Sequence, residues 1–405
     1  MSERTIGILS EASSLFSFRH EVRQRNPRSE RILRNSFIRT VGKTLQREMF
    51  RRKYGFAPQN ITVAPTDWCN LNCIDCYASA NEKPPEELES SVIDAVIEEA
   101  NDKWGMLFFT ITGGESLSQA MDIAKKHPDT LIQLYTNGTL IDQKIAREMA
   151  QMGNIFPLVS IEGLEEETDR IRGNGVYKRV LETMDTLTEE GVVWGISFTL
   201  TRNNADVYDN QEFLDTFIKK GAMLGRFLTY MPSGRNASFD KVPTLEQRKK
   251  QGDALRKLEQ EKIKFYSVDY LNNPSAFGGC AAAGVRYIYV NQSGDVFPCV
   301  FTSVPAIFNL KEAYDGVYLK EGLPIKSIED ILIHDPVLKL ARQISFRRPI
   351  EQSCLLIDKP EEFRDALSNL IAEYPHASFG DFFNRPYGQE LLKQYLSKTS
   401  ATLSV

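Results

Sequence analysis

The decisive stretch of this sequence is Ala64-Pro-Thr-Asp-Trp-Cys69-Asn-Leu-Asn-Cys73-Ile-Asp-Cys76-Tyr77, which follows a β-rich run at residues 61–66. Three cysteines within eight residues leave little room for disulfide geometry, and cytosolic thiols stay reduced, so metal ligation is the better interpretation. Three thiolates occupy three irons of a cubane and leave the fourth iron open, whereas most electron-transfer clusters have four cysteine ligands. A structural zinc site completed by a distant His or Cys is the alternative.

The sequence around this stretch predicts an α/β fold. Short β-rich runs alternate with helical periodicity from residue 58 to about 232, which is typical of repeated β/α units with a parallel sheet. Strands are expected at 61–66, 107–112, 131–136, 155–160, 193–200 and 225–231. Helices are expected at 88–104, 117–127, 141–152, 176–190 and 210–221. Six units predict a partial (β/α)6 barrel that stays open.

A second motif, Gly113-Gly114-Glu115, follows the second expected strand. Two glycines allow backbone to approach a ligand closely, and the carboxylate of Glu115 is an acceptor for an ammonium group. The carboxyl ends of parallel strands meet at one edge of the barrel, where active sites of such folds lie. Taken alone, the motif indicates no more than a turn.

The spacing C-x3-C-x2-C after a first strand resembles the radical S-adenosylmethionine (SAM) superfamily. The resemblance implies a [4Fe–4S] cluster at Cys69, Cys73 and Cys76 whose open iron binds SAM. An external donor such as a flavodoxin or ferredoxin then supplies the electron that cleaves SAM into a 5′-deoxyadenosyl radical. The same resemblance implies that the Gly113–Glu115 motif binds the methionine amino group. Asp75 differs from the aromatic residue common in the family, so Tyr77 is expected to take over the adenine contact.

The resemblance also implies SAM contacts at other strand ends. Ser160 and Glu162 match the position at which family members bind the ribose and methionine moieties, and Arg172 resembles the contact to the SAM carboxylate. Asn137 and Asn203 follow the third and fifth expected strands. For these two residues, capping or turn formation is the alternative to ligand binding.

The remaining cysteines form a spread trio of Cys280, Cys299 and Cys354. Residues 291–294 predict a hairpin turn between a run at 285–290 and a run at 295–301. The spacing of Gly294 and Cys299 resembles the start of a SPASM or twitch extension. With three cysteines, this resemblance implies at most one auxiliary iron–sulfur cluster, which has a non-cysteine fourth ligand or an open iron. Three unrelated buried thiols are the alternative.

The predicted organisation has four regions. Residues 1–57 form a basic helical segment, 58–265 the radical SAM core, 266–375 a small α+β auxiliary-cluster domain, and 376–405 a tail whose aromatic residues have no assigned role. Residues 244–264 are expected to form a charged, exposed helix that leads out of the barrel.

The amino-terminal segment is strongly basic. Residues 19–53 carry twelve Lys or Arg against three Glu, a charge of +9 on a chain whose formal net charge is −5. Apolar residues recur every four positions, as expected of an amphipathic helix; they are Leu33, Phe37, Val41, Leu45 and Met49. Packing on the barrel and binding to an anionic membrane surface are both open. Nucleic acid is disfavoured as a partner, because no aromatic stacking series accompanies the arginines.

The sequence contains no secretory h-region and no stretch of about 18 apolar residues, so a cytoplasmic protein is expected, with peripheral contact to the inner membrane face if the basic segment binds lipid. The main functional hypothesis is a radical SAM enzyme that abstracts hydrogen from a hydrophobic small molecule or lipid. A SPASM-type maturase acting on a peptide or protein is the alternative. A non-catalytic iron–sulfur or zinc protein is the hypothesis from a different class.

Overall fold

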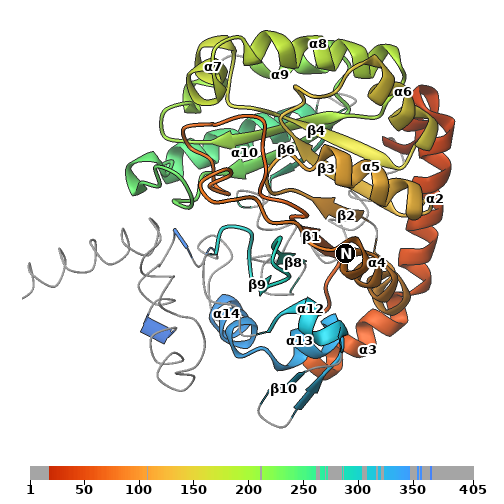
Figure 1. Cartoon of the computed structure of the whole chain (residues 1–405). Coiled ribbons are helices and arrows are strands. Elements are labelled where there is room, and N and C mark those ends of the chain that lie inside the picture. Colours follow the sequence, from red (N-terminus) through yellow and green to blue (C-terminus); the bar gives the residue numbers. More distant parts are fainter. Residues whose placement is uncertain are drawn as a thin grey trace, which may run out of the picture.

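A curled sheet of nine strands is the frame of the molecule (Figure 1). The computed structural model describes residues 18–106, 108–209, 212–260, 265–269, 271, 285, 287–302, 308–315, 318–320, 323–346, 354, 356–357 and 365–366. The predicted tail at 376–405 lies outside this described part.

Six consecutive strands pair in parallel and form the predicted partial barrel. They are β1 (Asn60–Val63), β2 (Phe108–Ile111), β3 (Leu131–Thr136), β4 (Ile155–Ile161), β5 (Gly195–Leu200) and β6 (Leu224–Thr229). Each strand lies beside the next one in the chain, so all six carboxyl ends meet at one edge of the sheet. The α/β partial barrel expected from the sequence is confirmed.

Three further strands extend this sheet at its two ends. β7 (Tyr266–Asp269) pairs in parallel with β6, and β8 (Tyr287–Val290) pairs in parallel with β1. β9 (Val296–Phe297) returns antiparallel to β8, which confirms the predicted hairpin. Gly294 in its turn has a φ of 88°, a value that favours glycine. The boundary at 265/266 between two domains stays a prediction, and strands on its carboxyl side belong to the barrel sheet.

Helices cover the outer face of the sheet (Figure 1). The expected helices are present as α4 (Ser90–Trp104), α5 (Leu117–Lys126), α6 (Gln143–Met152), α8 (Val176–Glu189) and α9 (Glu212–Lys219). The pattern missed α7 (Glu165–Arg172), a short helix between two glycine-containing turns. Beyond the hairpin lie α12 (Leu310–Tyr314), the β10–β11 pair (Tyr318–Lys320, Leu323–Ile325), α13 (Ile328–His334) and α14 (Pro336–Phe346).

The expectation of an exposed helix at 244–264 was wrong. α10 (Leu245–Gln260) buries Gln251, Leu255 and Leu258 on one face. Gln251 bonds to both Tyr208 and Asp269, at 3.0 Å each. A narrow stripe at i, i+4 and i+7 is therefore sufficient to dock a helix whose other positions are mostly charged.

The basic amino-terminal segment packs against the barrel. α2 (Pro27–Gly42) and α3 (Thr44–Tyr54) run along its side (Figure 1). The side chain of Asn26 caps α2 and also donates to the carbonyls of Ala150 and Gly191. Before α2, Phe18 and Val22 join Leu33 in an apolar cluster with residues at the amino ends of β3 and β6. This cluster closes the bottom of the barrel.

Several polar side chains of α2 and α3 bond to the barrel, whereas several apolar side chains of the same helices face outward. Ser36 donates to the carbonyl of Asp129, Thr40 to that of Gly105, and Arg47 to that of Trp104 at 2.7 Å. By contrast, Leu45 is 72% exposed and Met49 63% exposed. Packing on the barrel, one of the two expectations for this segment, is thus confirmed, although most of its apolar stripe remains on the surface. No helix in the described part of the chain has the length and apolar character to cross a bilayer.

Candidate functional site

A cavity of about 510 Å³ opens at the carboxyl ends of the barrel strands. It brings together the described residues that the sequence singled out for the site, with the exception of Asn203. These are Cys69, Cys73, Cys76, Tyr77, Gly113, Gly114, Glu115, Asn137, Ser160, Glu162, Arg172, Cys299 and Cys354. Cys280 lies outside the described residues. The volume is in the range of ligand-binding pockets.

The cysteine loop is fixed against the end of β2 by direct backbone contact. Gly114 donates its N–H to the carbonyl of Thr66 at 2.9 Å, and Glu115 donates to that of Trp68 at 2.7 Å. A Cβ atom on Gly114 would lie 2.0 Å from the Trp68 carbonyl oxygen, so no larger residue fits. Gly113 has a φ of 108°, and a Cβ atom there would lie 2.6 Å from the Thr66 carbonyl oxygen. The two glycines are therefore needed, first of all, so that the cysteine loop can pack directly against the end of β2.

The segment after β6 also holds the cysteine loop through hydrogen bonds, which sequence reasoning missed. Arg235 donates to the carbonyls of Cys73 at 2.7 Å and Ala80 at 2.6 Å, and its backbone N–H bonds to Cys76. Asn236 adds a bond of 2.6 Å to the carbonyl of Ile74. No local pattern predicts contacts between residues about 160 positions apart.

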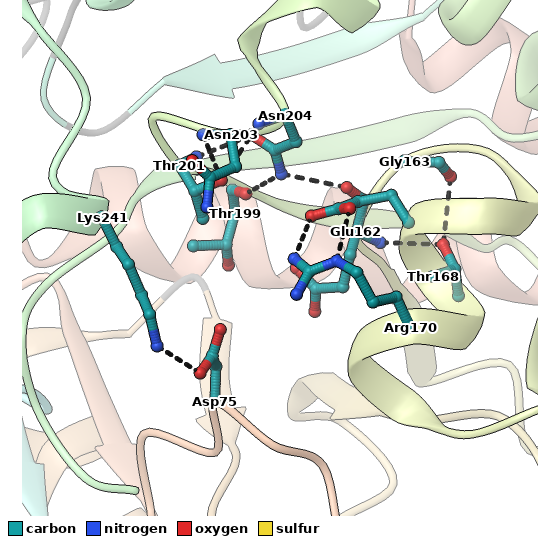
Figure 2. A network of polar contacts seen from close by, with 11 residues as sticks. Asp75, Glu162, Gly163, Thr168, Arg170, Thr199, Thr201, Asn203, Asn204 and Lys241 are labelled. Carbon is teal, nitrogen blue, oxygen red and sulfur yellow. Dashed lines mark hydrogen bonds and ion pairs between the residues drawn. The ribbon is translucent and has the colours of Figure 1, made fainter. Parts of the chain in front are cut away.

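Asp75, the departure from the family pattern, is held by an ion pair with Lys241 (Figure 2). The Lys241 ammonium lies 2.6 Å from the carboxylate and also donates to the carbonyl of Asn236. Asp75 thus fastens the cysteine loop to the same segment that carries Arg235. An aromatic residue at this position offers no such bond.

The three thiols of the loop suit a cluster that binds each through a different iron. Burial raises the pKa of Cys69 to about 11 and also raises the pKa of Cys73, so both are neutral thiols until metal displaces their protons. Leu71 N–H and the Asn137 amide point at the Cys69 sulfur, at 3.4 and 3.8 Å. None of the described cysteines forms a disulfide. In the described part of the chain no group of three or more His, Cys, Asp or Glu side chains is arranged to hold a metal ion.

Glu115 is a buried carboxyl group with a fixed orientation. It is 3% exposed and accepts the Thr136 hydroxyl at 2.6 Å and the Asn137 N–H at 2.7 Å. Burial raises its pKa to about 7, although both hydrogen bonds favour the charged form. A cation that enters the cavity next to Glu115 would restore the carboxylate, which makes this residue a suitable ammonium acceptor.

Glu162 and Arg172 form a mostly buried ion pair with an N–O distance of 2.5 Å. Burial raises the pKa of Glu162, against the opposing effect of Arg172. Asn204 donates to the carbonyls of Glu162 and Thr199 at 2.9 Å each and so ties the ends of β4 and β5 together (Figure 2). The sequence had pointed to Asn203, which is exposed, whereas Asn204 is buried and lines the cavity.

Tyr77 links the cysteine loop to β2 through its hydroxyl group. The hydroxyl lies 2.6 Å from that of Thr112 and accepts the Gly113 N–H at 3.1 Å. Its ring meets that of Phe301 edge to face, with centroids 5.6 Å apart. Tyr77 therefore stands between the cysteine loop and the hairpin region, and its adenine contact stays a prediction.

Two cysteines of the spread trio line the same cavity. The Tyr287 hydroxyl lies 2.9 Å from the Cys299 sulfur, and burial raises the pKa of that thiol to about 11. Cys354 is buried, with its sulfur 3.9 Å from that of Met231. Cys299 thus lies beside β8, and Cys354 lies beside the segment that follows β6.

Comparison with known proteins agrees with this geometry. Residues 63–214 match the family model of the Radical SAM superfamily. The mycofactocin maturase MftC of Mycolicibacterium smegmatis is 28% identical over 60% of this chain and 65% of its own length. An AdoMet-dependent heme synthase of Methanosarcina barkeri is 26% identical over 62% of this chain and 79% of its own length. The match thus spans just under two thirds of the maturase.

A solved structure supports the fold. SuiB of Streptococcus suis, bound to the precursor peptide SuiA, superposes with a TM-score of 0.56 at 17% identity, covering 76% of this chain and 73% of SuiB. Residues 63–214 thus match a Radical SAM domain, and SuiB shares the half-barrel fold.

We predict that Gly114→Ala lowers the iron and sulfide content of the anaerobically reconstituted protein and destabilises it by about 1–3 kcal/mol, because the new methyl group forces the cysteine loop off β2. Gly42→Ala is the matched control, since a Cβ there has open space and alanine favours the helix. Iron assay and thermal unfolding measure both effects. Wild-type iron content in Gly114→Ala would show that the loop contact is dispensable.

Proposed function

We propose that this enzyme reductively cleaves SAM at a [4Fe–4S] cluster on Cys69, Cys73 and Cys76 and uses the radical to modify a peptide or protein. The observation that supports it is the shared cavity, which joins three thiols, a buried carboxyl group and a mostly buried ion pair at the barrel mouth. When bound, the cluster supplies the electron that breaks a carbon–sulfur bond of SAM. An external flavodoxin or ferredoxin in the cytoplasm is the proposed electron source.

The residues of the chain bind and orient SAM in this proposal. Glu115 accepts hydrogen bonds from the methionine ammonium, and the Glu162–Arg172 pair offers the guanidinium for the carboxylate. Ser160 and Asn137 supply further polar contacts from the ends of β4 and β3. Tyr77 contacts the adenine moiety of SAM in this proposal. Arg235 and Lys241 hold the cysteine loop in position.

A peptide or protein substrate is favoured over a hydrophobic small molecule or lipid. The maturase similarity spans 60% of this chain, and the SuiB structure of the same fold was solved with a precursor peptide. The heme synthase similarity keeps a small molecule as the second candidate. A comparison of peptides and metabolites between a deletion strain and its parent separates the two.

The region from residue 266 onward is proposed to hold one auxiliary iron–sulfur cluster of the SPASM or twitch type. The presence of both Cys299 and Cys354 in the lining of the cavity supports this, with Cys280 as the third proposed ligand. The buried thiols would again lose protons on metal binding.

We predict that Cys69→Ala, Cys73→Ala or Cys76→Ala abolishes reductive formation of 5′-deoxyadenosine.

Glu115→Gln should instead keep the cluster absorbance and weaken SAM binding about tenfold or more, because it removes a charge-assisted contact to the ammonium. Chromatographic assay of 5′-deoxyadenosine and equilibrium binding of SAM measure the two effects. Wild-type turnover in any cysteine variant, or cluster loss in Glu115→Gln, contradicts the assignment.

For the second cluster, we predict about eight irons per chain in the reconstituted wild type and a fall toward four in Cys280→Ala, Cys299→Ala or Cys354→Ala. SAM cleavage at the first cluster should still be detectable by 5′-deoxyadenosine formation. Unchanged iron content in all three variants would leave the auxiliary cluster without support.

The outward face of α2 and α3 is proposed to contact an anionic membrane surface. Ile38, Val41, Leu45 and Met49 are all more than half exposed, and the segment carries a charge of +9. Arg34 and Arg52 are exposed on the same helices, where they would meet anionic headgroups. Deleting residues 1–53 is not a clean test, because Phe18, Val22 and Leu33 belong to the core.

We predict that the wild type binds vesicles containing phosphatidylglycerol and releases them as salt is raised, because each basic residue near the surface contributes about 1 kcal/mol before screening. A Leu45→Glu, Met49→Glu double variant should lose most of this binding and keep its unfolding temperature. Leu245→Glu, at an exposed leucine on α10, is the control and should bind normally. Vesicle sedimentation measures the effect, and binding equal to that on pure phosphatidylcholine would rule the contact out.

A further inference from the structure

A buried arginine stands on the inner wall of the barrel, away from the cysteine loop. Arg226 belongs to β6, lines the cavity and is 4% exposed. Its strand neighbours in register are Ser197 of β5 and Val268 of β7. It precedes the last residue of β6, Thr229, by three positions, which places it roughly 10 Å below the mouth of the barrel.

The guanidinium of Arg226 has neutral partners. With the side-chain oxygen of Gln133 turned toward it, Nε and Nη2 lie 3.1 and 2.7 Å from that oxygen. Nη1 faces the carbonyl of Gly225 at 3.5 Å, and the Tyr266 ring lies 5.9 Å away. Within the described part of the chain Arg226 forms no ion pair with a carboxylate.

The carboxylates that line the same cavity are bonded elsewhere. Their partners are Lys241 for Asp75, Thr136 and Asn137 for Glu115, Arg172 for Glu162 and Arg170 for Glu167. The sequence from 270 to 294, which joins β7 to the hairpin, contains no Asp or Glu. Arg172, the other described cation in the cavity lining, has Glu162 as its counter-charge.

A buried cation without a counter-charge is costly, and an apolar side chain of similar length carries no such penalty. The guanidinium fork matches a carboxylate through two parallel hydrogen bonds. We propose that Arg226 binds a carboxylate group of the substrate at the floor of the cavity. The rest of the substrate then extends toward the cysteine loop. This inference rests on the proposed function, since it names a chemical feature that the substrate of that site must carry.

The same carboxylate chemistry occurs at a peptide terminus and in a small acid. Binding to the reconstituted enzyme without reductant is therefore measured by calorimetry for two pairs of probes. One pair is N-acetyl-Gly-Phe and its carboxyl-terminal amide, and the other is 3-phenylpropionate and 3-phenylpropionamide. For at least one pair we expect the acid to bind about tenfold more tightly than the amide, because the charged contact is desolvated. Preference confined to the dipeptide pair indicates a peptide carboxylate, and preference in the small-acid pair indicates a small molecule.

Arg226→Met should remove the preference for the acid, and Arg226→Lys should retain part of it, because the charge stays while the fork is lost. Arg248→Met is the matched control: Arg248 is a buried arginine on α10 outside the cavity lining, and its variant should keep the preference. Equal affinity of acid and amide for the wild type, or a preference that survives in Arg226→Met, overturns the inference. SAM cleavage by the wild type is assayed separately, so a failure there points to the proposed function instead.

Discussion

Two stretches of backbone meet at the mouth of the barrel, and the arrangement of the site depends on how closely they approach. The loop after β1 carries the cysteines, and the loop after β2 carries Glu115. Parallel pairing of β1 and β2 brings the two loops to the same edge, and Gly114 allows contact at a distance that any side chain would prevent. Thr136 and Asn137 at the end of β3 then fix the carboxyl group of Glu115. Sheet register thus sets the spacing between the thiols and the carboxyl group of Glu115.

The features that sequence reasoning predicted are those with a local signal. The cysteine spacing, the Gly-Gly-Glu motif and the alternation of β and helical periods are each visible within a few residues, and they placed six strands correctly. Asn203 was chosen over Asn204 because strand ends are uncertain by a residue or two, and one step along the chain separates a side chain in the cavity from one in water. α10 was taken for an exposed helix because its charged residues outnumber the stripe of Leu255 and Leu258 that docks it.

Contacts that join distant segments had no such signal. Arg235, Lys241 and Arg226 look like ordinary charged residues in the sequence, and only the curled sheet brings the first two to the cysteine loop and the third to the lumen. Arg226 is a charged residue inside the barrel, and α2 and α3 carry apolar residues on the protein surface. Both placements are the reverse of the usual one. Each reversal lowers stability in the isolated chain, and such positions are where binding sites are commonly found.

The contacts of Arg235 and Lys241 with the cysteine loop also bear on how the protein folds during synthesis. Residues 69–76 are synthesised early, but the groups that hold them in place, Arg235 and Lys241, are translated about 160 residues later. On the ribosome the loop can pack against the end of β2 early, but it lacks the contacts of Arg235 and Lys241 until the segment after β6 has emerged. Complete support of the three thiols therefore requires a chain translated beyond Lys241.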